Sequence, residues 1–373
     1  MVLDRRYERA CLLAEQGRFA LAEKEALAAL AENPESDRAH NILSYCYLHQ
    51  ARYEAATTSA RQAISLAPDN GFHHYRLASV YRQSGQYSLA MSAIETSLKL
   101  DPTHLDTYSL AASVCYREER IDQMLIFANK GLALNPEHEG CWDMRVLGLL
   151  SQGNLEQAES EIVRLLARYP DRAFSHAAKG WLAIYQDRGR KSVEIALEAF
   201  KTALQIAPES DWARQGMMES LRSRNIFYRW VLRYSFWQSR LSRASRGAFW
   251  AFWLLLPPVR GLYGLLVLLV WTIRQVSTTA LRLHPYGRLL FTPQEKWLHN
   301  SASLMIGLMV LAATVAIVRN EGLWLVLIGP PGLIAWLATI GWTQQGRGRA
   351  VYIGFALIAG LIWMGAVAEL LLA

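Results

Sequence analysis

The chain of 373 residues is poor in cysteine and lacks the short motifs that identify common enzyme classes. It has no HExxH, phosphate-binding loop, GxSxG or GxGxxG pattern, which gives no support to a zinc peptidase, a nucleotide-binding enzyme or a serine hydrolase. The four cysteines form no CxxC pair and are expected to be free, buried thiols in a reducing compartment; they are Cys11, Cys46, Cys115 and Cys141. We therefore expect no catalytic site and no cofactor.

The histidines give no sign of a metal site. His40, His73 and His74 fall within helical segments, where we expect them to pack rather than to bind a metal. His104 and His138 occupy equivalent positions two residues after a proline. The first residues of the chain also lack the apolar core of a secretory signal, so we expect the N-terminal part to remain in the cytoplasm.

Prolines recur at a fixed interval of 34 residues, and this period is the strongest pattern in the sequence; they are Pro34, Pro68, Pro102, Pro136 and Pro170. A period of this length is typical of a helix–turn–helix solenoid. Proline lacks an N–H group and restricts the residue before it, so each preceding helical run is expected to end there. Glycines at 17, 85 and 153 mark turns between the two helices of a repeat.

Small and apolar residues four apart recur where two helices must approach closely; the pairs are Ala56/Ala60, Ala90/Ile94, Ala158/Ile162 and Ala196/Phe200. With the prolines and turns, they resemble the tetratricopeptide repeat family over about residues 3–210. Trp142 keeps the tryptophan of the family pattern, while His40, His74 and Tyr108 replace it. The resemblance implies an all-α superhelical solenoid of about six helix–turn–helix repeats.

A sixth repeat ends at Pro208, 38 residues after Pro170, so four extra residues must be accommodated around Asp187–Lys191. Trp212 and Gly216 repeat the spacing of a first helix. Residues 209–222 are therefore predicted to form a capping helix, and residues 1–222 a cytoplasmic solenoid.

Charge is strongly segregated along the chain, whose net charge is +7. Acidic residues outnumber basic ones up to residue 221, whereas residues 222–246 contain arginines and no acid. Aromatic residues interleave with these arginines at spacings of three and four, which predicts a basic amphipathic helix over 223–247 on anionic lipid headgroups. A solvated linker and a nucleic-acid surface are less consistent with the aromatic residues, and we expect no nucleic-acid partner. The predicted membrane-interface residues are Arg229, Trp230, Arg233, Tyr234, Trp237, Arg240 and Arg243.

The remainder, residues 248–373, is predicted to be an α-helical transmembrane domain. Stretches near 301–318, 323–342 and 351–371 are apolar over the roughly 17–25 residues that a spanning helix requires. A further block, 248–273, is interrupted by Pro257 and Pro258 and forms either one kinked span or a hairpin. The hairpin places both basic loops in the cytoplasm and is favoured for that reason.

Segments at 224–237, 240–242 and 281–290 resemble bacterial membrane proteins that pair a cytoplasmic tetratricopeptide repeat array with several C-terminal spans. The resemblance implies the bacterial inner membrane as the location, with multiple spans and the repeats in the cytoplasm. It names no reaction.

First helices of stacked tetratricopeptide repeats line a concave groove that binds an extended peptide or a partner helix. The residues predicted to face this groove are Arg38, Asn41, Tyr45, Tyr75, Ser79, Arg82, Ser109, Ser113 and Tyr116. Arginine and asparagine suit carboxylates or peptide backbone, and tyrosine offers rigid contact area. Packing between repeats and plain solvent exposure are the alternative roles of each residue. Their order does not reproduce the Lys/Asn/Arg clamp with which some members of the family hold a C-terminal carboxylate.

These features predict a membrane-anchored scaffold or adaptor that recruits partner proteins or assists assembly of a membrane complex, with a homo-oligomer also open. Two alternatives remain. The proline-broken apolar segments also suit a small transporter or channel with a regulatory repeat domain. A non-catalytic subunit of a membrane enzyme differs from a scaffold only in what its partner does.

Overall fold

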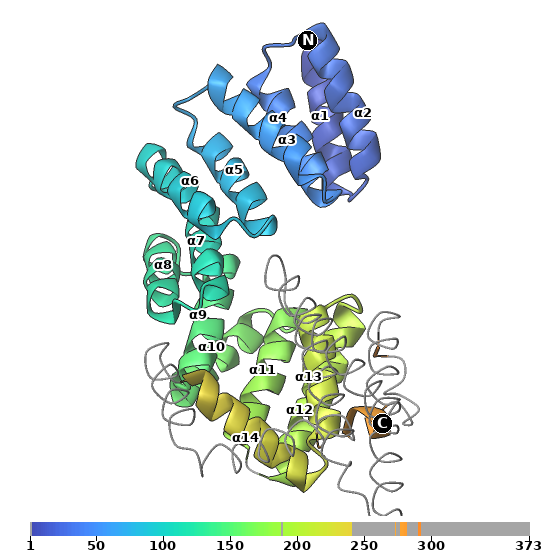
Figure 1. The fold of residues 1–373 in the computed structure, drawn as a ribbon, viewed down its shortest axis with the longest axis vertical. Helices are drawn as coiled ribbons and strands as arrows, with labels where there is room; N and C mark the ends of the chain where they lie inside the picture. Colours follow the sequence, from blue (N-terminus) through green and yellow to red (C-terminus); the bar gives the residue numbers. More distant parts are fainter. Residues whose placement is uncertain (1, 188, 241–272, 274–276, 282–289, 292–373) are drawn as a thin grey trace, which may run out of the picture. The chain divides into compact units, whose positions relative to one another are not determined.

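The computed structural model describes residues 2–187, 189–240, 273, 277–281 and 290–291. Fourteen α-helices have their bounds within these residues, and none of these residues lies in a β-strand (Figure 1). The helices are α1 (Val2–Glu15), α2 (Phe19–Glu32), α3 (Asp37–His49), α4 (Tyr53–Leu66), α5 (Gly71–Gln83), α6 (Tyr87–Leu100), α7 (Leu105–Arg117), α8 (Ile121–Leu134), α9 (Glu139–Gln152), α10 (Leu155–Arg168), α11 (Ala173–Gln186), α12 (Arg190–Ile206), α13 (Asp211–Arg222) and α14 (Ile226–Arg240).

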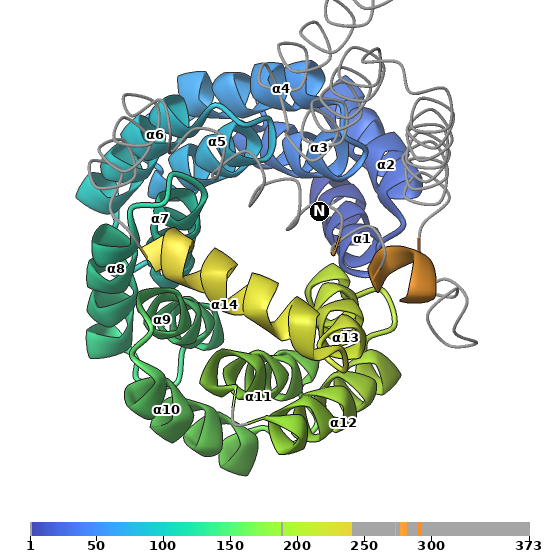
Figure 2. The same ribbon diagram turned by 60° about the horizontal axis from the view of Figure 1, so that its bottom comes forward.

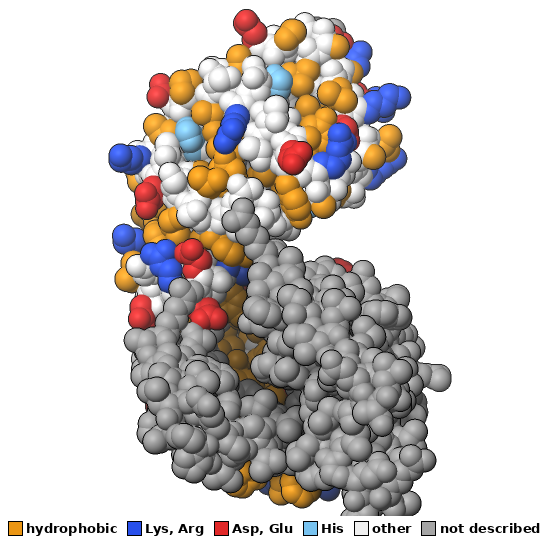
Figure 3. Space-filling model, in the orientation of Figure 1, with side chains coloured by type: hydrophobic (Ala, Val, Ile, Leu, Met, Phe, Trp, Pro, Cys, Tyr) orange, Lys and Arg blue, Asp and Glu red, His pale blue; other side chains and the backbone are white. Residues whose placement is uncertain are grey.

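The chain divides into two compact units, Met1–Glu161 and Ile162–Ala373, and the boundary falls inside α10. Helices α1–α9 lie in the first unit and α11–α14 in the second. Acidic, basic and apolar side chains are interspersed over the face of the first unit that Figure 3 shows.

Helices α1–α12 form six consecutive helix–turn–helix pairs, as the proline period predicts. The second helix of each pair ends two residues before a proline of the series; the last helical residues are Glu32, Leu66, Leu100, Leu134, Arg168 and Ile206. Asn33 and Asn135, each directly before a proline, are extended, with φ of −139° and −142°. Proline sterics thus end the helices where the sequence indicates.

The turn inside each repeat places one residue in the left-handed region, and that residue recurs every 34 positions. Gly17, Gly85 and Gly153 have φ of 72°, 78° and 81°, in agreement with the predicted turns. The same position in the intervening repeats is held by Ala51 and Glu119, with φ of 58° and 59°. A side chain is disfavoured there because its Cβ approaches the backbone, so these two turns are strained.

A ring donor near the start of the first helix closes the junction between repeats. His40 Nε2 donates to the carbonyl oxygen of Pro34 at 3.1 Å, and His74 Nε2 donates to Pro68 at 3.1 Å. The Tyr108 hydroxyl donates to Pro102 at 3.0 Å and His176 Nε2 to Pro170 at 2.7 Å. Trp142 instead donates to Glu161 Oε2 at 2.8 Å. His40 and His74 therefore serve the repeat junctions.

Small residues let the paired helices approach closely in the first unit. One core cluster combines Tyr81, Ile94 and Val114 with fully or nearly fully buried alanines; these are Ala60, Ala78, Ala90, Ala93 and Ala111. An alanine at these contacts brings the backbones together without leaving a void. The predicted small-residue spacing is thus part of the core.

The cysteines are free among the described residues, as predicted. Cys46, Cys115 and Cys141 are fully buried, whereas Cys11 is half-buried. Burial raises the pKa of the Cys46 and Cys141 thiols to about 11, so both are protonated at neutral pH.

The sixth repeat, in the second unit, has four residues more than the 34-residue period. These residues lengthen its two helices, α11 and α12, and not the turn between them. Compared with α7 and α8, α11 is longer by one residue and α12 by three. The predicted capping helix is α13, whose Trp212 stacks on Phe174 with ring centroids 5.1 Å apart. Phe200 of α12 is fully buried in the core that α13 covers.

The predicted basic helix is α14, and it folds back on the repeats of the second unit (Figure 2). Tyr228 and Leu232 are buried in the core with residues of α11, α12 and α13. Phe236 packs on Tyr185 with ring centroids 4.4 Å apart. Val231 is also buried, whereas Phe227 and Trp230 are 66% and 71% exposed. One apolar side of the helix is thus used for packing within the protein.

No helix with described bounds is both long enough and apolar enough to cross a bilayer. The predicted segments 248–273, 301–318, 323–342 and 351–371 lie outside the described residues, apart from Ile273. Trp237 and Arg240 belong to α14, whereas Arg243 lies outside the described residues.

The strained turns give a stability prediction. Replacing Ala51 or Glu119 by glycine should raise the free energy of unfolding by about 0.5–1 kcal/mol, because glycine adopts the left-handed conformation freely. The control Ala28→Gly, inside α2, should lower it by about 1 kcal/mol. Chemical denaturation of the full chain followed by circular dichroism measures both; destabilisation by both turn variants would contradict the assigned strain.

Candidate interaction surface on α3, α5 and α7

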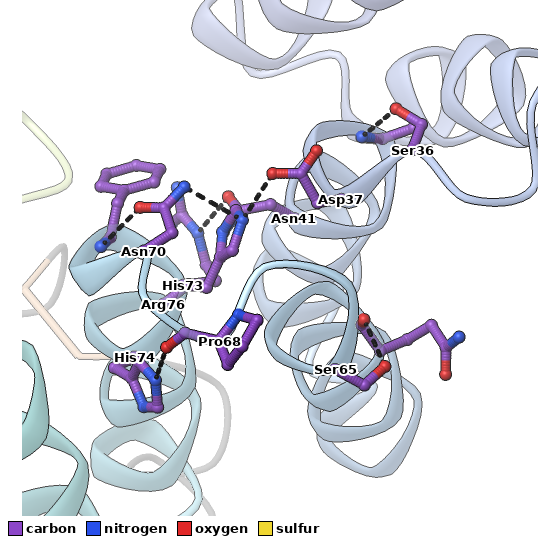
Figure 4. A network of polar contacts seen from close by, with 12 residues as sticks. Ser36, Asp37, Asn41, Ser65, Pro68, Asn70, His73, His74 and Arg76 are labelled. Carbon is purple, nitrogen blue, oxygen red and sulfur yellow. Dashed lines mark hydrogen bonds and ion pairs between the residues drawn. The ribbon is translucent and has the colours of Figure 1, made fainter.

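Four polar side chains of α3 and α5 form a chain of hydrogen bonds between neighbouring repeats (Figure 4). His73 is 2% exposed; its Nε2–H donates to Asp37 Oδ2 at 2.8 Å, and its Nδ1 accepts from the Asn41 amide at 2.8 Å. Asn41 Oδ1 in turn accepts from Arg76 Nε at 3.4 Å. The network orients the Arg76 guanidinium through partners that are themselves hydrogen-bonded.

Two aromatic rings from neighbouring repeats flank Arg76. Its guanidinium carbon lies 4.3 Å from the ring centroid of Tyr45 and 5.4 Å from that of Phe72. Phe72 stacks on Tyr75 at 5.7 Å, and Tyr75 contacts His104 at 4.9 Å. We call this set the Arg76 surface; it consists of Tyr45, Phe72, Tyr75, Arg76, Arg82 and His104.

The Arg76 surface carries positive charge without an acidic partner. Among the described residues, no carboxylate forms an ion pair with Arg76 or Arg82, and Arg82 Nε is buried without a hydrogen bond. Burial lowers the pKa of both guanidiniums, and the charge of Arg117 lowers that of Arg82 further. Burial is also the main cause of the raised pKa of the Tyr75 hydroxyl. Buried charges are normally paired, so both arginines can still form an ion pair with an anion.

The nine predicted groove residues fall into three groups. Asn41, Tyr45, Tyr75 and Arg82 belong to the Arg76 surface or support it. The serine hydroxyls donate to carbonyls of their own helices; these bonds run from Ser79 to Tyr75, Ser109 to Asp106 and Ser113 to Leu110. Arg38 and Tyr116 are exposed. Asn41 is only 5% exposed and its amide is used within the protein, so it positions Arg76.

Sequence reasoning missed Arg76 itself, along with Asp37, Phe72 and His73. A signal was present in the period: one repeat before and one repeat after Arg76 stand Ile42 and Leu110, both buried. A charged residue at an apolar repeat position departs from the packing rule and thus marks a functional candidate. No group of three potential metal ligands occurs in the part of the chain that the structure describes.

Comparison with known proteins identifies the repeats. Residues 7–71 and 144–211 match one tetratricopeptide repeat family, and residues 74–104 match a second. No curated protein matches the chain in sequence.

Solved structures are similar to this chain at low identity. The APC/C hetero-tetramer Cut9-Hcn1 has a TM-score of 0.51 and 12% identity, over 59% of this chain and 43% of that chain. Pseudomonas aeruginosa pilF has a TM-score of 0.47 and 16% identity, over 57% and 95%. YrrB, described as having an unusual peptide-binding site, has a TM-score of 0.38 and 20% identity, over 51% and 96%. The chain therefore carries tetratricopeptide repeats on an all-α, solenoid-like fold.

Proposed function

We propose that this protein is a membrane-anchored adaptor, held in the bacterial inner membrane with its repeats in the cytoplasm. The Arg76 surface would hold an acidic segment of a partner protein and so recruit that partner to the membrane. Tetratricopeptide repeats build extended binding surfaces, and YrrB illustrates peptide binding by such a protein.

The observation that carries the proposal is the pair of guanidiniums without a carboxylate partner. Arg76 lies among aromatic rings at a repeat position that is isoleucine in the preceding repeat and leucine in the following one. The Asp37–His73–Asn41 network holds its guanidinium in place. Such an arrangement is costly for folding alone, since a partly buried charge loses hydration without gaining an ion pair. A carboxylate from a partner would supply the missing pair.

Aromatic side chains make the same surface suitable for protein contact. Tyr45, Phe72 and Tyr75 are stiff, and Phe72 is 41% exposed. Tyrosine and arginine dominate the energetic centres of protein interfaces because they combine large contact area with polar groups.

The membrane part of the proposal rests on α14 and on the sequence that follows it. Ile226, Phe227 and Trp230 are 56%, 66% and 71% exposed, on the same helix as Arg229 and Arg233. An exposed apolar stripe beside arginines suits a lipid interface. The apolar stretches after residue 248 would provide the anchor.

Arg76→Leu separates binding from folding. Because leucine and isoleucine fill the same position in adjacent repeats, the variant should have an unfolding midpoint equal to or above that of the parent chain. Binding of an acidic partner segment should weaken roughly tenfold to a hundredfold, as for loss of a hydrogen bond to a charged group. Thermal denaturation of the full chain measures the first effect. A clear drop in the midpoint would show that Arg76 serves the fold.

Affinity capture from detergent-solubilised native membranes identifies the partner. We expect proteins with an acidic segment to be recovered with the parent chain and lost with Arg76→Leu/Arg82→Gln. The control Arg18→Gln/Lys24→Gln removes the same charge from exposed positions of the first unit and should retain them. Equal recovery by both variants would reject the Arg76 surface as the binding site.

Membrane extraction tests the anchor. The full chain should stay in the membrane pellet after a high-salt wash and after an alkaline carbonate wash. A chain ending at Arg240 should be released by salt, since only α14 would then contact lipid. The truncation must keep α14, because Tyr228 and Leu232 belong to the core of the second unit. Release of the full chain by salt alone would reject the transmembrane anchor.

A further inference from the structure

Helix α14 presents three different sides. Tyr228, Val231 and Leu232 are buried, while Ile226, Phe227 and Trp230 are exposed. Arg229 and Arg233 follow Ile226 and Trp230 by three residues, and at about 100° per residue they lie between the two apolar sides. The arginines thus line the edge at which α14 meets the repeats.

A basic cavity of about 370 Å³ lies at this edge, in the second unit. Its lining residues come from α12, from the turn after α13 and from α14; they are Arg190, Val193, Glu194, Leu197, Ser223, Arg224 and Arg229. Arg190 pairs with Glu194 at 3.3 Å, which leaves Arg224 and Arg229 as the cations without a carboxylate in the described part of the chain. Arg229 Nε is buried and has no hydrogen-bond partner there. The cavity therefore has unused capacity for an anion.

A second, smaller cavity of about 130 Å³ adjoins the first, since Val193, Ser223 and Arg229 line both. Its remaining lining has an apolar part, which includes Ala183, Ile184, Leu232 and Phe236, and it also contains the ion pair between Asp187 and Arg233. A free phosphate ion gains nothing from apolar side chains, whereas the glycerol and first acyl carbons of a lipid would be removed from water there. The paired cavities thus favour an amphiphile with an anionic head.

We propose that the cavity between α12 and α14 binds the phosphate headgroup of an anionic phospholipid. Arg224 and Arg229 donate to the phosphate oxygens, and the adjoining apolar cavity receives the start of the lipid chain. The exposed Phe227 and Trp230 place the same helix at the lipid interface. This inference rests on the membrane location in the proposed function and is independent of the Arg76 surface.

Binding of defined probes to the full chain in dodecylmaltoside tests the site by isothermal titration calorimetry. The probes are dihexanoyl phosphatidylglycerol, dihexanoyl phosphatidylcholine and inorganic phosphate. We expect phosphatidylglycerol to bind more tightly than either of the others. Arg224→Gln/Arg229→Gln should weaken it roughly tenfold or more, since two hydrogen bonds to a charged group are lost. The control Lys179→Gln/Lys201→Gln removes equal charge from exposed positions of the same unit and should leave binding unchanged.

Arg224 is exposed, so the single variant Arg224→Gln removes one donor without altering the core and should itself weaken binding several-fold. Equal affinity of phosphatidylglycerol for the double variant and the parent chain would overturn the site. Inorganic phosphate binding as tightly as phosphatidylglycerol would overturn the lipid assignment. A full chain that is absent from cell membranes but binds phosphatidylglycerol at these arginines would refute the membrane adaptor and leave the site in place.

Discussion

Close approach of paired helices is the constraint on which the repeats depend. Alanines at the contacts between helices are fully buried, and they recur because each repeat must present the same interface to the next. The ring donor bonded to the preceding proline carbonyl then fixes how one repeat meets its neighbour. Histidine and tyrosine stand where the family pattern has tryptophan, and their N–H or O–H reaches the proline carbonyl, whereas Trp142 donates to Glu161.

The architecture was readable from the sequence because it is built from local and periodic rules. Proline sterics, the left-handed turn residue and small-residue spacing each act within one repeat, and together they predicted the six helix pairs and the cap. The groove residues were predicted from repeat position alone. That rule found Tyr45 and Tyr75, but it could not show that the hydroxyls of Ser79, Ser109 and Ser113 would bond to their own helices.

The missed residues depend on contacts between repeats. The period marks Arg76 by its charge at an apolar repeat position, but its surroundings depend on the fold: its rings come from α3 and α5, and its amide partner from the repeat before. Likewise, the sequence pattern of α14 is amphipathic, but the core formed by α11, α12 and α13 determines which of its apolar sides faces the protein. Sequence periodicity defines a helix face but not its neighbour.

Local contact between adjacent repeats also limits how far a change can spread. The contacts of α5 run to α3, α4, α6 and α7, its neighbours along the solenoid. In an array with such nearest-neighbour coupling, stability is approximately a sum over repeats and their interfaces. The free-energy cost of the unpaired Arg76 charge therefore falls on its own repeat and the adjacent ones. Residues of this surface can change during evolution, and with them the bound partner, while the distant repeats keep their sequence.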